Sequence, residues 1–392
     1  MTITKKNANL YFSLILGLFW MILGLMLGMV SVYLQAQGFS NSKIGLTLGC
    51  VYTLSTFLQP ALAVLYDRTG KPLRQCIAVT YAVVALLTAS VLFLPVSGIA
   101  LTVNLIALFA LQSALQSCVN SLVQTFEQAG FDVNFGAARG VGSLVYGIVI
   151  AIAGAALEKY SALHLPAVYL GLTLAMILLL TLPKMDDRAP HRRSAQKSAG
   201  KHSGLTNPGF ILLLIASGCF SLNAVVNGSF MLQIMQELGG NSAEYGLATS
   251  IAAIVEFPAM LLYSRFSKRF GENKLLMLSG WAWFVKNGLI VLARSPEAIY
   301  AAQVLQFASY AFFIPGVVRY IAKLLPEESF LKGQSLYGSA YTAGSVAATF
   351  LGGTLLDAVG VRSTLSIAQL FSLLGAVLLT ASVIKSGRQA QK

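Results

Sequence analysis

Long runs of hydrophobic residues, separated by short polar segments, make up most of this chain. The first run, Tyr11–Leu34, is long enough to cross a membrane, because one helical span needs about 20 apolar residues. The runs are continuous and lack the alternation that is typical of transmembrane β-strands, so helices are predicted. We predict twelve helical spans, at 11–36, 43–66, 73–95, 99–127, 137–156, 163–182, 209–236, 243–264, 273–293, 297–324, 332–357 and 361–384.

The composition of the chain supports an all-α membrane protein with many spans. Hydrophobic types make up 56% of its 392 residues and charged types only 10%, whereas soluble domains carry roughly 25% charged residues. A soluble enzyme is therefore excluded. The net charge of +13 does not indicate a nucleic-acid partner, because the basic residues occupy short gaps between apolar runs and do not form a solvated face.

The longest polar gap divides the predicted spans into two groups of six. We predict an N-terminal half at 1–183, a cytoplasmic linker at 184–208 and a C-terminal half at 209–392. The linker is rich in charged residues and lacks apolar periodicity, which is typical of a flexible segment.

The two predicted halves repeat short sequence features with a nearly constant offset along the chain. Gly45–Leu46 follows the first span and Gly246–Leu247 follows the seventh, while Pro60 and Pro258 lie in the second and eighth. Such a repeat predicts two pseudo-symmetric halves with a binding site near the middle of the membrane.

The distribution of basic residues predicts the orientation. With both termini in the cytoplasm, most of the 27 Lys and Arg residues lie on the inner side, as the positive-inside rule requires. The first run is too long for a signal-peptide core and lacks a small-residue cleavage site, so it is expected to be retained. We therefore predict a multi-pass protein of the cell membrane. The basic residues placed outside are Lys43, Lys159, Arg294 and Arg362.

The segment Asp67-Arg68-Thr69-Gly70-Lys71 joins the second and third spans. It resembles the signature that the major facilitator superfamily carries in this loop, although Ala63 replaces the leading Gly and Pro72 the last basic residue. The resemblance implies a twelve-helix fold in two halves, with Asp67, Arg68, Gly70 and Lys71 in a gating loop. A solvated turn on the positive inner side is the alternative.

The segment Asn134–Arg139, followed by Gly142 and Tyr146, resembles the start of helix 5 in lactose-permease-like proton symporters and their phenylpropionate-permease relatives. In that family an Arg on helix 5 pairs with a carboxylate on helix 4, and an aromatic ring stacks on the sugar. The resemblance implies that Arg139 and Tyr146 bind the substrate. A helix end and ordinary packing are the respective alternatives. The helix 4 position corresponds to Gln124 or Glu127.

Two ionisable residues are predicted at depth in the membrane. At 1.5 Å per residue, Glu256 lies about 20 Å along its helix from Arg269, and Lys286 lies at a similar depth on the next span. A charge at this depth is costly, so such residues are functional candidates. We predict that Glu256 carries a proton and that Lys286 is its partner, with a structural tether as the alternative. Lys286 also corresponds to a functional Arg of lactose permease.

Other positions depart from the lactose-permease pattern. Gln306 and Ser309 stand where that family has a His and a Glu on helix 10, and Asn227 and Gln303 replace an ion pair. Many amides with few charges suit a neutral, hydroxylated or amphipathic solute, although helix–helix hydrogen bonds explain some of them. Asn120, Asn227 and Gln306 are predicted to bind substrate.

These observations predict a secondary active transporter that imports a small organic solute with protons. The solute is a sugar, a nucleoside or an aromatic acid. Efflux of amphipathic compounds by proton antiport is the first alternative, and a non-transporting membrane sensor is the second. The predicted partners are the solute, protons and the lipid bilayer. We expect a monomer with no cofactor, no metal site and no nucleic-acid partner, since the chain lacks nucleotide-binding and metal-ligand motifs.

Overall fold

The computed structural model describes residues 3–94, 97–131, 133–183 and 206–389, and these form helices without any strand. They divide into two compact units. Unit 1 comprises Met1–Phe39 and Cys50–Gln196, and unit 2 comprises Ser40–Gly49 and Lys197–Lys392. Most of the predicted linker, at 184–205, lies outside the described residues.

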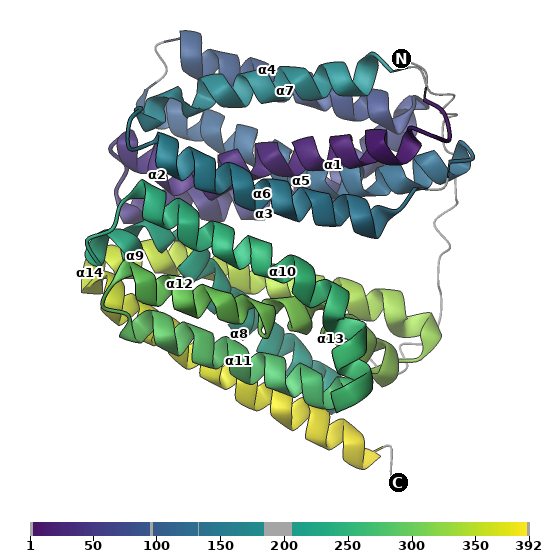
Figure 1. The fold of residues 1–392 in the computed structure, drawn as a ribbon, viewed down its shortest axis with the longest axis vertical. Coiled ribbons are helices and arrows are strands. Elements are labelled where there is room, and N and C mark those ends of the chain that lie inside the picture. Colours follow the sequence, from purple (N-terminus) through teal and green to yellow (C-terminus); the bar gives the residue numbers. More distant parts are fainter. Residues whose placement is uncertain (1–2, 95–96, 132, 184–205, 390–392) are drawn as a thin grey trace. The chain divides into compact units, whose positions relative to one another are not determined.

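Unit 1 contains six predicted spans, and its first span is interrupted by a π-helical turn. Asn134 begins α6 by accepting a hydrogen bond from the Ala137 amide at 2.9 Å, which satisfies a free donor of the first turn. Its helices, drawn in purple to blue in Figure 1, are α1 (Ala8–Leu23), η1 (Gly24–Gly28), α2 (Val30–Ala36), α3 (Asn41–Thr69), α4 (Leu73–Phe93), α5 (Gly98–Gln128), α6 (Phe135–Ala156), η2 (Ala162–His164) and α7 (Leu165–Thr181).

Unit 2 repeats this plan. Its second span begins with a capping box, in which the Asn241 side chain accepts from the Glu244 amide and the Glu244 carboxylate accepts from the Asn241 amide. Its helices, drawn in green to yellow in Figure 1, are α8 (Pro208–Ser229), α9 (Met231–Glu237), α10 (Ser242–Phe270), α11 (Glu272–Leu292), α12 (Pro296–Val304), η3 (Leu305–Phe307), α13 (Tyr310–Leu324) and α14 (Glu327–Gln389).

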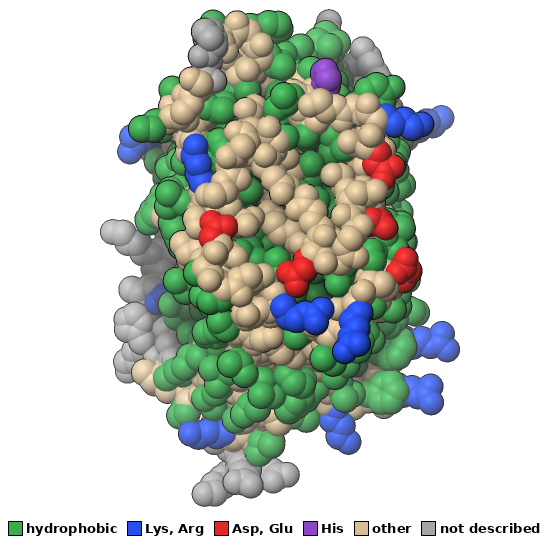
Figure 2. Space-filling model, turned by 90° about the vertical axis from the view of Figure 1, so that its left-hand side faces the viewer, with side chains coloured by type: hydrophobic (Ala, Val, Ile, Leu, Met, Phe, Trp, Pro, Cys, Tyr) green, Lys and Arg blue, Asp and Glu red, His purple; other side chains and the backbone are tan. Residues whose placement is uncertain are grey.

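The predicted number of spans agrees with the helices. Eleven stretches among the described residues are long and apolar enough to cross a membrane. The last of them, Lys332–Ser386, has 55 residues, so at 1.5 Å per residue it is about 80 Å long and suffices for two crossings. Gly360 has φ 78° and interrupts α14 between the predicted spans 332–357 and 361–384. Counting the last stretch as two crossings gives the twelve predicted spans. Figure 2 shows one face of the molecule, on which hydrophobic side chains surround a central area of backbone and other side chains, with Lys, Arg, Asp and Glu scattered over it.

Three spans that the pattern predicts as continuous are broken, and in this respect the prediction is wrong. The span at 11–36 is interrupted by η1 and Met29, and the span at 209–236 by Phe230. The span at 297–324 changes into the 3₁₀ turn η3. Met29 and Phe230 are as apolar as their neighbours, so hydropathy alone carries no signal of the breaks at these two residues.

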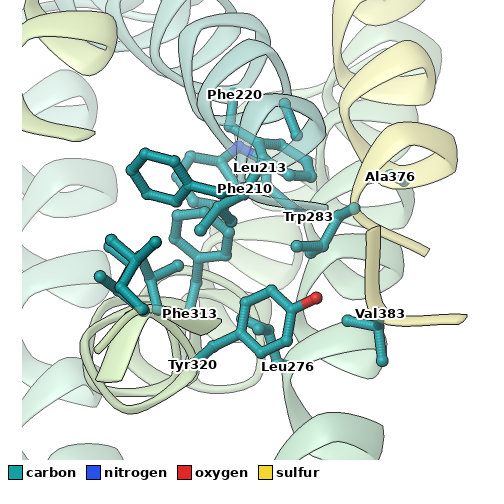
Figure 3. Packing of buried hydrophobic residues seen from close by; sticks show 14 residues of the cluster. Phe210, Leu213, Phe220, Leu276, Trp283, Phe313, Tyr320, Ala376 and Val383 are labelled. Carbon is teal, nitrogen blue, oxygen red and sulfur yellow. The ribbon is translucent and has the colours of Figure 1, made fainter. Parts of the chain in front are cut away.

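The core of unit 2 is an aromatic cluster from four helices. Phe220 of α8 stacks on Trp283 of α11, with ring centroids 5.0 Å apart, and meets the edge of Phe313 of α13 at 5.2 Å. Figure 3 shows these rings beside Ala376 of α14. Such pairs add about 0.5–1.5 kcal/mol beyond the area they bury, and they hold α11 and α13 at fixed positions.

The first residues of α3 pack within unit 2, on α14. The Asp357 carboxylate accepts hydrogen bonds from the Asn41 side chain at 2.9 Å and from the Ser42 amide at 2.7 Å. Gly45 and Gly353 lie at the crossing, where a Cβ on either would collide with the opposite backbone. The carboxylate thereby satisfies the free amides at the start of α3.

Candidate functional site

Glu256, Gln306 and Lys286 form a continuous hydrogen-bonded chain in unit 2. The Gln306 side-chain Nε2 donates to Glu256 Oε1 at 2.7 Å, and the Lys286 Nζ donates to Gln306 Oε1 at 2.5 Å. All three side chains are half-buried. An amide that donates at one end and accepts at the other fits an ionised acid and a protonated amine, so the neutral Gln306 links two opposite charges.

The backbone of three helices brings these side chains together. Gln306 lies in η3, the 3₁₀ turn that separates α12 from α13. Glu256 lies in α10 two residues before Pro258, which has no amide hydrogen and so cannot bond to the Ile254 carbonyl. Lys286 lies in α11. The predicted acid and base are thus near one another, with a residue predicted as substrate-binding between them.

Asn227 belongs to a second polar cluster of unit 2. Its Nδ2 donates to Asn287 Oδ1 at 2.6 Å and lies 3.3 Å from Asn223 Oδ1. Asn223 donates to the Ala368 carbonyl of α14, and Asn287 donates to the Trp283 carbonyl. Asn287 did not figure in the sequence analysis. The cluster joins α8, α11 and α14, so Asn227 has a structural part whatever else it binds.

Gln233, in the short helix α9, has neither amide atom bonded to a partner within the described residues, although the side chain is only 5% exposed. A buried polar atom without a partner is costly. This side chain is therefore available to a polar ligand or to water.

Arg139, Trp20 and Tyr146 form the polar and aromatic cluster of unit 1. The Arg139 guanidinium carbon lies 3.7 Å from the centroid of the Trp20 ring, and its Nη1 donates to Ser143 Oγ at 2.6 Å. The Tyr146 ring meets Trp20 edge-on at 6.1 Å. The two predicted residues thus share one indole ring, and Trp20 is the residue that sequence reasoning missed. Trp20 lies on α1 and the two predicted residues lie on α6, so the positions in the sequence gave no signal of this contact.

Two glycines shape this cluster. A Cβ on Gly142 of α6 would lie 2.4 Å from the Trp20 ring, and one on Gly24 of η1 would lie 2.9 Å from the Tyr146 ring. Both rings therefore lie directly against backbone. The buried Trp20 Nε1 donor has no hydrogen-bond partner among the described residues, so the cluster holds one unsatisfied donor.

The candidate residues of the fourth predicted span lie in α5. Asn120 of α5 is half-buried, and its Oδ1 has no partner in the described part of the chain. Glu127 is exposed near the end of the same helix. The side chain of Gln124 lies outside what the structure describes.

The predicted gating loop is exposed at Asp67, Arg68, Gly70 and Lys71. Gly70 takes φ 63°, a conformation that favours glycine, and lets the chain reverse after α3.

The next basic residue after this loop, Arg74, is buried and hydrogen-bonded. Arg74 is only 5% exposed, and its Nη1 donates to the Tyr11 hydroxyl and the Pro183 carbonyl, both at 3.0 Å. The sequence analysis counted it only as an inner-side charge.

The twelve spans, the paired units and the charged groups within spans define a polytopic membrane transporter. The profile of the MFS_1 like family matches residues 10–367, and the chain belongs to this family. Its relatives and its fold are those of transporters of the major facilitator superfamily rather than of enzymes, which confirms the resemblance and the predicted fold class.

A curated relative and two solved structures show how far the similarity extends. The maltose permease of Geobacillus stearothermophilus is 29% identical over 353 residues, which cover 88% of this chain and 87% of the permease. A mutant of the nucleoside transporter NupG superposes with a TM-score of 0.80 at 15% identity, over 96% of this chain and 99% of NupG. An inward-facing bacterial homologue of the human lysosomal transporter Spinster gives 0.68 at 13% identity, over 97% of both chains. These two likenesses show the fold alone.

Proposed function

We propose that this protein imports a small, neutral, hydroxylated solute, a sugar or a nucleoside, by proton symport across the cell membrane. The observation that carries the proposal is the chain from Glu256 through Gln306 to Lys286. A carboxyl group at membrane depth that is linked to a base can exchange a proton during transport.

Two further observations support the choice of solute. The Arg139–Trp20–Tyr146 cluster combines aromatic rings with hydrogen-bond donors, a combination that suits a sugar ring or a base. A relative is named for maltose, and a transporter with the same fold is named for nucleosides; both kinds of solute are neutral and hydroxylated. We propose that Arg139, Tyr146 and Asn120 bind the solute, with Glu127 or Gln124 as partner of Arg139 and Gln306 as a link to the proton site.

The proposed mechanism is alternating access, in which the predicted halves 1–183 and 209–392 move against one another. Protonation of Glu256 removes the negative charge that orients the Gln306 amide. Lys286 then loses the opposite charge that stabilises it through this amide, and the three helices become free to rearrange. The protein is proposed to act as a monomer with both termini in the cytoplasm, and the exposed loop Asp67–Lys71 is proposed as a gate on that side.

The test is accumulation of labelled maltose and labelled uridine in proteoliposomes under an imposed pH gradient. Wild-type protein is expected to accumulate one of them only with the gradient. Glu256→Gln is expected to keep exchange and lose accumulation, because it mimics the protonated acid. Accumulation by Glu256→Gln at the wild-type level contradicts the proton-carrier role. Gradient-driven exclusion in place of accumulation supports the alternative of efflux.

A further inference from the structure

An apolar cavity lies inside unit 1, beside the break in its first helix. The wall is formed by η1 and α2 on one side and by α4, α5 and α7 on the others. Met26 and Met29 line it at the break, and Leu105, Leu108 and Phe109 line it from α5.

The few polar groups in the wall are already bonded within the protein. The Tyr33 hydroxyl accepts from Gln37 at 3.0 Å, and the Tyr169 hydroxyl donates to Gln112 at 3.2 Å. The Thr88 hydroxyl donates to the Val84 carbonyl at 2.8 Å. None of the lining residues is charged. A sugar or a charged solute would lose its hydration here without gaining equivalent partners, so the cavity selects an apolar occupant.

The more exposed part of the cavity wall lies on α4 and α7. Its inner wall is almost fully buried, with Met29 at 0% and Leu108 at 3% exposure, whereas Val91 of α4 and Pro166 of α7 are half-exposed. In Figure 1, α4 and α7 lie at the edge of unit 1. Two residues after Val91 on the same helix, Phe93 is 77% exposed, so the apolar wall of the cavity leads along α4 to an exposed hydrophobic side chain.

From this geometry we propose that the cavity binds one acyl chain of a membrane phospholipid. The chain enters between the ends of α4 and α7 and reaches Met26 and Met29. The apolar wall, the bonded polar groups and the exposed hydrophobic side chain to which the wall leads all suit a flexible hydrocarbon chain. The occupant would contact the residues at the break, so it would stabilise the broken form of the first helix. This site is separate from the Arg139 cluster and does not depend on the proposed solute or on proton coupling.

The test uses the full chain in vesicles that contain phosphatidylethanolamine with a photoreactive group near the end of one acyl chain. After illumination, mass spectrometry locates the cross-links. The expected result is labelling of the segments Met26–Tyr33 and Leu105–Phe109, which are shielded from bulk lipid. Labelling confined to exposed residues such as Phe93 and Val103 overturns the proposal.

Matched variants on α5 make the test specific. Leu108→Trp fills the cavity and is expected to reduce labelling of Met26–Tyr33 several-fold, whereas Val103→Trp, at a position 59% exposed, is expected to leave it unchanged. Thermal unfolding shows whether Leu108→Trp folds. If it does not, Leu105→Phe replaces it as the cavity-filling variant, because it adds less volume. Undiminished labelling of Met26–Tyr33 in a folded cavity-filling variant contradicts the assignment.

Discussion

Met29 and Phe230 interrupt the first helix of each unit with nearly the same backbone conformation. Met29 has φ −108° and ψ 8°, and Phe230 has φ −115° and ψ 18°. Each is followed by a seven-residue helix, α2 or α9. The offset between the two residues is the same as that between the repeated Gly45–Leu46 and Gly246–Leu247 steps. The internal repeat thus extends to the position of a helix break, and breaks of this kind lie at binding sites in many transporters.

The break in unit 1 predicts different effects for two glycines of the same span. Gly24→Ala would place a Cβ 2.9 Å from the Tyr146 ring, whereas Gly17→Ala meets nothing closer than 3.7 Å. Gly24→Ala is therefore expected to displace Tyr146 and weaken solute binding several-fold. Gly17→Ala is expected to leave binding unchanged and to stabilise the helix by about 0.5–1 kcal/mol. Thermal-shift titration with the transported solute checks both. Equal affinity in the two variants would show that Tyr146 does not contribute.

Gln306→Ala removes the link between Glu256 and Lys286. Hydrogen bonds to charged groups contribute about 1.5–3 kcal/mol, so we expect gradient-driven accumulation to fall by about tenfold or more. Ser309→Ala is the matched control, because the Ser309 hydroxyl donates to the Leu305 carbonyl of the same stretch. Initial rates in proteoliposomes at several imposed pH gradients give the measurement. If Gln306→Ala lowers solute affinity but keeps the dependence on the gradient, the amide serves binding and not coupling.

Arg139→Lys is expected to weaken solute binding nearly as much as Arg139→Ala. The Arg139 guanidinium carbon lies 3.7 Å from the centroid of the Trp20 ring, and an ammonium group cannot reproduce this planar group with its several N–H donors. Trp20→Phe keeps an aromatic surface but removes the Nε1 donor, so a smaller loss is expected. Trp281→Phe is the control, since Trp281 lies in unit 2 and donates to Thr380. Binding titrations rank the variants, and wild-type affinity in Arg139→Ala would reduce Arg139 to an inner-side charge.

Asn287→Ala leaves the buried Asn227 amide without its 2.6 Å acceptor. A buried polar group that loses its partner costs about 1–3 kcal/mol, so unfolding is expected at lower temperature. The double variant Asn227→Ala/Asn287→Ala is expected to lose less than the sum of the single losses, because neither change then leaves the other amide unpaired. Thermal unfolding in detergent measures the four forms. Strict additivity would show that the two side chains do not stabilise each other.

The predicted orientation is tested by cysteine labelling in a chain whose natural cysteines, Cys50, Cys76, Cys118 and Cys219, are replaced. Ser198→Cys lies in the predicted cytoplasmic linker, and Lys159→Cys lies in a loop predicted to be outside. An impermeant maleimide applied to intact cells is expected to label only the second. The reverse pattern would invert the topology.

Much of this protein follows from the sequence because the membrane imposes simple rules. Each span must bury its backbone polar groups in a helix and cover it with apolar side chains, so hydropathy located the spans and the two groups of six. The cost of a charge at depth in the membrane likewise drew attention to Glu256 and Lys286. These inferences need only distance along the chain.

Contacts between helices needed the tertiary structure. Hydropathy does not record which face of one helix meets another, so nothing in the sequence placed Trp20 under Arg139 or joined Asn287 to Asn227. The breaks at Met29 and Phe230 lie in apolar runs that show no interruption in their hydropathy. The turn η3, which places Gln306 between an acid and a base, likewise lies within a single predicted span. Packing decided these features, because a helix in a bundle bends where its neighbours leave room and supply the missing hydrogen bonds.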